Sequence, residues 1–383
     1  MHGSLTASAH NPDAPASEHP VHRAEFLLLV GLLLIFSEGI LPRLLSGDES
    51  ADGSALLRYL WLPVYAVTFA GIVWKIREVA QACVRLPFLM GLLAVCAVSF
   101  AWSIDPGLTQ RRSLAIIMTT AAGLYVGSRY SWRTLLRALA ITWFIIAVTS
   151  FLTALTVPAF GRDFEIHGGA WKGLFYEKNQ LGGHMARAAL FGAFLAIMDR
   201  PYRRIWLSLA GLSVLLVLLT TSKTALLGLL IGFGILCTAA IMKRGMVFGL
   251  VMAWLGVVVS AIGVGMLVFA PELVVSVLGR DLTLTGRTDI WIVLMDFISE
   301  RPLLGYGYGA FWDEGSNPGN WVREMLEWDA PTAHNGWIEV TLALGLIGLV
   351  LLAFDFLMTI WRAAWASINT CTGRPALKPC PCS

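Results

Sequence analysis

Apolar runs of about twenty residues recur along most of this chain, and they restrict its fold more than any other feature. An α-helix of that length crosses a bilayer, because it bonds its own backbone polar groups where no water can. The runs predict about ten membrane spans. They lie at 25–45, 57–74, 86–102, 113–128, 135–157, 180–198, 205–221, 224–241, 247–269 and 337–360.

The composition supports a membrane location for these runs. Hydrophobic residues make up 57% of the 383 residues and charged residues only 14%, whereas about a quarter of the residues of a soluble domain are charged. Because the apolar excess must face lipid, the expected fold class is all-α, a polytopic inner-membrane helix bundle.

Basic residues fall in alternate short loops, and this pattern orients the spans. Such loops lie on the cytoplasmic side of a membrane, so both chain ends are expected inside and one large loop in the periplasm. The basic clusters are Lys75, Arg77 and Arg85; Arg129, Arg133 and Arg137; Arg200, Arg203 and Arg204; and Lys243 and Arg244.

The resulting organisation has five parts. We expect a disordered cytoplasmic leader at 1–24, a transmembrane helix bundle at 25–269, a large periplasmic loop at 270–336, a last transmembrane helix at 337–360, and a short cytoplasmic tail at 361–383.

A polar island stands out between Gly286 and Gly348, and two of its residues can carry chemistry. Arg287 follows a glycine where a helix is expected to begin, a natural anion site. His334 precedes the last span and could act as a general base, with a structural histidine as the alternative. A fixed positive charge and a titratable base at one membrane face suit an anionic, lipid-linked substrate.

Two further polar segments lie at span ends. Gln180, His184 and Arg187 share one helix face, which predicts either a helix-packing network or a wet functional cavity. The turn around Lys223 surrounds an ammonium with hydroxyls, a combination that suits phosphate. Snorkelling of Lys223 to the membrane surface is the alternative.

Metal and cofactor motifs are not found in the sequence. It contains no H-E-x-x-H segment and no P-loop. Cys371, Cys380 and Cys382 lack a fourth zinc ligand. We therefore expect no metal and no cofactor.

Four motifs of the polar island together resemble the O-antigen ligase and Wzy-type polysaccharide polymerase superfamily. The Trp102–Pro106 and Glu177–Gly183 segments, with Arg111 to Ser113, resemble its exopolysaccharide polymerase branch. The four motifs are Gly286-Arg-x-x-x-Trp291, Pro302-Leu-x-Gly-x-Gly307, His334-Asn-x-x-x-Glu339 and Gly345-Leu-x-Gly348.

The resemblance implies a GT-C-like, metal-independent, inverting glycosyltransferase of the bacterial inner membrane, with its active site on the periplasmic side. It implies His334 as the base and Arg287 as a contact to the donor's pyrophosphate. Lys223 stands where a second arginine is usual, which keeps the charge but loses the bidentate fork. The residues expected to bind substrate are Lys223, Ser222, Asn179, Arg187, Asn335 and Glu339.

The expected function is polymerisation of oligosaccharide repeat units carried on undecaprenyl pyrophosphate, in exopolysaccharide or O-antigen synthesis. One alternative is an O-antigen ligase that transfers glycan to lipid A–core. A polysaccharide flippase is an alternative of another class, although such transporters tend to show internal repeats and broken helices, neither of which is expected from this sequence. Expected partners are the lipid-linked glycan, the bilayer, and chain-length regulator or export proteins, but no nucleic acid. Relatives usually continue with further spans after the His-Asn helix, so the tail is expected to be truncated.

Overall fold

The computed structural model describes residues 23–37, 39, 43, 55–164, 168–242, 251, 254–256, 258, 287–326 and 330–371. Within these ranges the regular secondary structure is helical, apart from an antiparallel pair of short strands, β1 (Arg162–Asp163) and β2 (Ala170–Trp171). The all-α fold class is therefore confirmed for this part. The predicted span at 247–269 falls largely outside it, as do most of the leader and the end of the tail.

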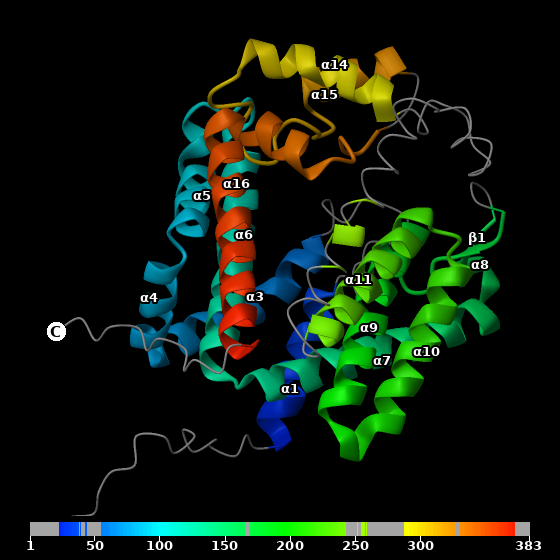
Figure 1. Cartoon of the computed structure of the whole chain (residues 1–383). Coiled ribbons are helices and arrows are strands. Elements are labelled where there is room, and N and C mark those ends of the chain that lie inside the picture. Colours follow the sequence, from blue (N-terminus) through cyan, green and yellow to red (C-terminus); the bar gives the residue numbers. More distant parts are fainter. Residues whose placement is uncertain are drawn as a thin grey trace, which may run out of the picture. The chain divides into compact units, whose positions relative to one another are not determined.

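The chain divides into two compact units, 1–64 with 129–236 and 65–128 with 237–383. In the first unit, the helices α7, α9 and α10 pack side by side (Figure 1). Small residues on α9 allow this packing, since a Cβ at Gly192 would lie 2.9 Å from the Trp206 carbonyl oxygen. The helices of this unit include α1 (Arg23–Phe36), α7 (Trp132–Thr156), α8 (Pro158–Gly161), α9 (Lys178–Met198), α10 (Arg203–Leu219) and the first part of α11 (Lys223–Met242).

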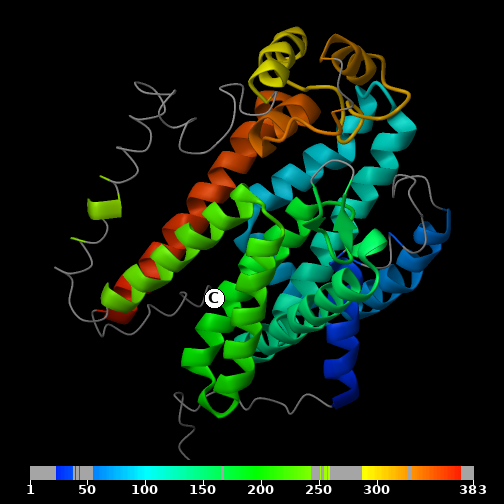
Figure 2. The ribbon, with the colours of Figure 1, turned by 90° about the vertical axis from the view of Figure 1, so that its right-hand side faces the viewer.

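In the second unit, α5 lies along α16, with the rings of Phe88 and Phe354 stacked 5.2 Å apart. Two loop helices, α14 and α15, lie at the N-terminal end of α16 (Figure 2). The helices of this unit include the second half of α3 (Ala55–Trp74), α4 (Ile76–Arg85), α5 (Pro87–Val98), α6 (Pro106–Arg129), α14 (Arg287–Glu300), α15 (Asn317–Leu326) and α16 (Gly336–Cys371).

The described residues contain four helices that are long and apolar enough to cross a membrane. A fifth is counted if Ile76–Arg85 and Pro87–Ala101, which meet at 96°, form one broken span. These helices support a multi-pass membrane protein, whereas the number of about ten spans and the periplasmic side of the large loop stay predictions. The four are Trp132–Thr156, Lys178–Met198, Arg200–Leu219 and Gly336–Trp365; Trp61–Trp74 and Lys223–Thr238 are shorter apolar helices.

The last span is broken at Gly345, where φ is 64° and ψ is −162°. Such a break leaves backbone groups of a membrane helix without partners inside the helix. An extended segment from the large loop supplies them. The Tyr306 N–H donates to the Leu342 carbonyl over 2.8 Å, and the Leu346 N–H donates to the Pro302 carbonyl over 2.8 Å.

This pairing explains the glycines of two motifs. A Cβ at Gly345 would lie 2.2 Å from the Leu303 carbonyl carbon, and one at Gly305 would lie 2.4 Å from the Leu342 carbonyl oxygen. Both glycines also have a positive φ, which other residues adopt at a cost. The Pro302–Gly307 and Gly345–Gly348 motifs are therefore two halves of one backbone contact.

Candidate active site

The described part of the large loop folds into a compact cap on the start of α16. Ile290 and Leu294 of α14, Val322 of α15 and Leu342 of α16 are fully buried together with Phe311. A cap with its own apolar core can hold side chains in fixed positions, as a catalytic site requires.

The Trp102–Asp105 motif joins this cap through main-chain groups. The Trp102 indole N–H donates to the Leu304 carbonyl over 2.8 Å, and the Ile104 N–H donates to the Tyr306 carbonyl over 3.1 Å. The Ser103 side chain lies so close to Gly307 that a Cβ there would come within 2.3 Å of its Oγ. This motif therefore anchors the glycine-rich segment by contacts of its own, in addition to those that α16 makes.

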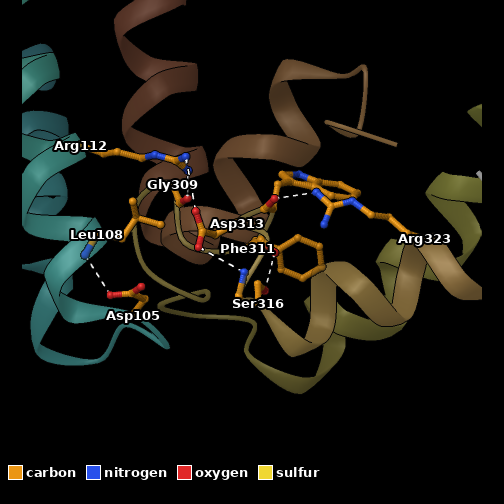
Figure 3. A network of polar contacts seen from close by, with 10 residues as sticks. Asp105, Leu108, Arg112, Gly309, Phe311, Asp313, Ser316 and Arg323 are labelled. Carbon is orange, nitrogen blue, oxygen red and sulfur yellow. Dashed lines mark hydrogen bonds and ion pairs between the residues drawn. The ribbon is translucent and has the colours of Figure 1, made fainter. Parts of the chain in front are cut away.

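Charged residues near the cap are largely engaged in the network of Figure 3. Arg112 donates to the Gly309 carbonyl and lies 3.8 Å from the Asp313 carboxylate. Asp105 Oδ1 accepts from the Leu108 N–H over 2.9 Å, at the start of α6. Arg323 donates to the Trp312 carbonyl over 2.6 Å. These residues hold the loop in shape.

Tyr306 is tied into the cap and does not suit acid–base chemistry. Its hydroxyl donates to the Phe297 carbonyl over 3.0 Å and to Glu300 Oε2 over 2.9 Å. Burial, together with the Glu300 carboxylate, raises the pKa of Tyr306 well above its usual value. The phenol therefore stays protonated at neutral pH.

His334 lies on the surface of the cap, just before α16, and adopts a left-handed backbone conformation with φ of 51°. Such a conformation is strained for a residue other than glycine and persists only where the surroundings impose it. The Ala333 residue before it is completely buried. The imidazole is thus exposed, whereas the residue before it is buried in the cap.

Trp291 and Glu339 bind the backbone of Ala333. The Trp291 indole N–H donates to the Ala333 carbonyl over 2.8 Å. Glu339 Oε1 accepts from the Ala333 N–H, and Oε2 accepts from the Trp312 indole over 3.1 Å. The two motifs that contain Trp291 and Glu339 therefore converge on the residue preceding the expected base.

The remaining predicted residues of this unit are placed as follows. Asn335 caps α16, because its Oδ1 accepts from the Trp337 N–H over 3.0 Å. Arg287 is the first residue of α14, and its side chain lies outside the described atoms. Arg287 stands one turn of α14 before Trp291.

In the other unit, the Glu177–Gly183 segment meets the hydroxyl-rich turn before α11. Ser222 Oγ donates to Asn179 Oδ1 over 2.8 Å, and Lys178 Nζ donates to Thr221 Oγ1 over 3.5 Å. Gly182 permits the contact, since a Cβ there would lie 2.7 Å from that of Ala225. The structure thus brings the predicted Asn179 and Ser222 together.

Lys223 and Arg187 are both exposed. Lys223 is the first residue of α11, directly after the buried Ser222. Arg187 Nε donates to the Gly183 carbonyl of its own helix over 3.1 Å. His184, on the same predicted face, instead stacks on Phe175 at 4.8 Å. The predicted polar stripe is therefore divided between an exposed arginine and a packed histidine.

Sequence reasoning missed Arg43 and Lys178. Arg43 is buried and donates to the carbonyls of Phe160, Gly173 and Phe175 at 2.6, 3.2 and 2.9 Å. It thereby fixes the loop that leads into α9. Arg43 belongs to no recognised motif, whereas Lys178 stood within one and could have been singled out.

The predicted site residues are divided between the two units. The second unit contains Arg287, His334, Asn335 and Glu339, and the first unit contains Asn179, Arg187, Ser222 and Lys223. Their joining in a single active site stays a prediction. In the described ranges, no three His, Cys, Asp or Glu side chains are grouped as metal ligands would be; metal independence likewise stays a prediction.

Comparisons with known proteins identify the family context of these motifs. Residues 207–353 match the family described as O-Antigen ligase. Over 311 residues the chain is 26% identical to the exopolysaccharide production protein ExoQ of Rhizobium meliloti (strain 1021), covering 76% of this chain and 67% of that protein. No solved structure matches the chain. These matches confirm the resemblance of the chain to the O-antigen ligase and Wzy-type superfamily, on the exopolysaccharide side.

Proposed function

We propose that this membrane protein of polysaccharide biosynthesis is a polymerase that joins repeat units carried on undecaprenyl pyrophosphate, at the periplasmic face. The family match supports a glycan-transferring enzyme, and the relative's name, exopolysaccharide production protein, favours the polymerase. The observation that carries the proposal is the pair of hydrogen bonds from Trp291 and Glu339 to the backbone of Ala333. It presents His334 on the surface and draws the Arg287 end of α14 toward the same residue.

In the proposed reaction, His334 takes the proton from a hydroxyl of the acceptor sugar. The hydroxyl oxygen then attacks the donor's anomeric carbon from the face opposite the pyrophosphate. The new glycosidic bond forms as the bond from that carbon to the phosphate oxygen breaks, which inverts the configuration. Undecaprenyl pyrophosphate leaves with the bonding electron pair, and the imidazolium gives its proton to water.

Positive charge would stabilise the departing pyrophosphate. We assign that role to Arg287 and Lys223, with Asn179, Ser222 and Arg187 as further polar contacts to the substrate. A positioned base typically contributes about 10²–10⁴-fold, and preorganised charge at the developing anion adds a few kcal/mol. No metal is needed in this scheme, and chelator-resistant turnover of the purified enzyme is its expected mark.

Glu339 and Asn335 take part indirectly. Glu339 positions His334 through Ala333, and Asn335 caps the helix that follows. Their expected role in substrate binding thus becomes one of orientation.

A ligase is the second candidate, because the matching family is described as O-Antigen ligase. The lipid-linked glycans that accumulate in a deletion strain distinguish the two. Single repeat units on undecaprenyl pyrophosphate are expected for a lost polymerase. Long chains on that lipid would indicate a ligase, and repeat units trapped on the cytoplasmic face would indicate a flippase.

The same strain tests the base. His334→Ala should give the deletion phenotype while its level in the membrane matches that of the unaltered protein. Polymer production at the unaltered rate would exclude His334 as the base.

A further inference from the structure

A cavity of about 550 Å³ lies in the first unit, between the beginning of α7 and the end of α9. It shares no residue with the candidate active site. It is lined by Trp132, Arg133, Leu136, Arg137, Phe194, Leu195, Met198 and Asp199.

One acidic and two basic residues line this cavity, but they are not equivalent. Arg137 binds the Asp199 carboxylate through Nε and Nη2 at 2.9 and 2.8 Å, and the Trp206 indole donates to the same carboxylate over 3.1 Å. Asp199 and Arg137 thus neutralise one another. Arg133 is exposed and makes no hydrogen bond or ion pair with any of the residues that the structure describes. One positive charge therefore remains at the cavity.

The apolar lining lies deeper along both helices than Arg133 and Asp199. Arg133 belongs to the first turn of α7, with Leu136 about one turn further on. Asp199 follows the end of α9, and Leu195 and Phe194 lie about one turn before it. A charge at the helix ends above an apolar wall matches a phospholipid, which has a charged headgroup above acyl chains.

Trp132 strengthens this match. Its side chain is 79% exposed at the end of a membrane-spanning helix, where tryptophan prefers the headgroup region. Met198, which also lines the cavity, is 61% exposed, although both side chains are large and apolar. Lipid contact would remove that exposure.

We propose that this cavity binds an anionic phospholipid, with the headgroup phosphate at Arg133, the headgroup region against Trp132, and an acyl chain along Phe194, Leu195 and Met198. The occupant is anionic because the one unneutralised charge is a cation. The alternating basic loops predict that this end of the bundle faces the cytoplasm, where the leaflet carries anionic lipid.

The test uses the full chain purified in a mild detergent. Phosphatidylglycerol or phosphatidylcholine is titrated in, and the shift of the thermal unfolding midpoint gives the apparent affinity. We expect phosphatidylglycerol to bind more tightly, and Arg133→Gln to weaken it about fivefold, the effect of one basic residue near anionic lipid. Arg204→Gln makes the same charge change on an exposed residue outside the cavity, and should change the affinity little.

A second measurement does not depend on the stability of the Arg133 variant. Phosphatidylglycerol with brominated acyl chains should quench part of the tryptophan fluorescence, and Trp132→Phe should remove that part. Equal quenching by brominated phosphatidylcholine would overturn the proposal. So would an equal loss in Arg204→Gln, which indicates diffuse surface attraction, or an equal shift with inorganic phosphate, which indicates a small-anion site.

Discussion

Trp291 and Glu339 bind the two backbone polar groups of Ala333, one at the carbonyl and the other at the N–H. Both residues come from family motifs whose arginine and histidine suggest chemistry. Their own part is to hold the peptide that carries His334 in its left-handed conformation. The motifs therefore contain residues that fix the backbone next to His334, as well as residues that could react.

Trp291→Phe keeps most of the ring packing and removes the hydrogen bond to Ala333. One neutral hydrogen bond is worth about 0.5–1.5 kcal/mol, so the turnover rate should fall about twofold to tenfold. The donor KM should change little, because His334 is expected to act on the acceptor. Steady-state kinetics of the purified enzyme measure both. Trp365→Phe, an exposed tryptophan on α16, is the matched control; an equal loss there would contradict a positioning role.

Glu339→Gln should cost more than Trp291→Phe. A carboxylate accepts from both Ala333 and Trp312, whereas an amide has one oxygen and would turn its NH₂ group toward the other donor. Hydrogen bonds to a charged group contribute about 1.5–3 kcal/mol, so a loss of roughly 10–100-fold in rate is expected. The Trp291→Phe/Glu339→Gln double variant should lose less than the product of the single effects, because both act on Ala333. Full multiplicativity would indicate separate roles.

Gly345→Ala should remove folded protein from the membrane. The added methyl group would meet the Leu303 carbonyl at 2.2 Å, at a positive φ. Core overpacking costs about 1–3 kcal/mol and left-handed strain adds to it. Gly211→Ala places the same group in open space on α10, where alanine is favoured by about 0.5–1 kcal/mol. Immunoblots of membrane fractions and thermal unfolding measure the difference; equal stability of the two variants would contradict the tight backbone contact.

Arg287→Lys should impair polymer production more than Lys223→Arg. The guanidinium can hold two phosphate oxygens at once, and an ammonium cannot reproduce that geometry. Lys223→Arg introduces the residue usual in the superfamily and should leave production nearly unchanged. Complementation of a deletion strain by each variant, at matched membrane levels, measures both effects. Full production by Arg287→Lys would remove the bidentate contact from the mechanism.

Asp199→Asn should destabilise the first unit. The hydrogen bonds from Arg137, with Trp206 and the nearby Arg133, lower the pKa of Asp199 below its usual value. A lowered pKa in the folded state stabilises above the unfolded pKa of about 3.9, and this stability is lost as pH falls through the folded value. At neutral pH the variant should lose about 1–3 kcal/mol, and the gap should close on acidification. Thermal unfolding at several pH values tests this, with the exposed Asp296→Asn as control; a pH-independent gap would contradict it.

The helical class and the motifs could be predicted because they depend on local sequence. An apolar run of about twenty residues predicts a membrane helix without any information about distant contacts. The cap of α7 is also local, because Ser131 accepts from the Thr134 N–H three residues later. The break in the last helix could not be predicted, because its hydrogen-bond partners lie about forty residues earlier at Pro302 and Tyr306, and backbone pairing is indifferent to side chains. In the sequence, only Gly305 and Gly345 indicate this close backbone contact.

The roles within the site divide in the same way. His334 and Arg287 were singled out by residue type, and their roles remain proposals. The hydrogen bonds of Glu339 to the Ala333 N–H and the Trp312 indole could not be predicted, because Trp312 lies 27 residues earlier in the chain. Arg43 stayed hidden because an isolated arginine after an apolar run looks like any other loop residue, although three carbonyls converge on it.

The break at Gly345 also bears on where His334 lies along α16. Gly345 lies nine positions after Gly336 in α16, which corresponds to about 14 Å of helix rise. Because the segment around Pro302 is bonded across the break itself, the cap cannot slide along the helix without losing those bonds. The distance of His334 from the Gly345 break is therefore fixed by the number of helical turns between them.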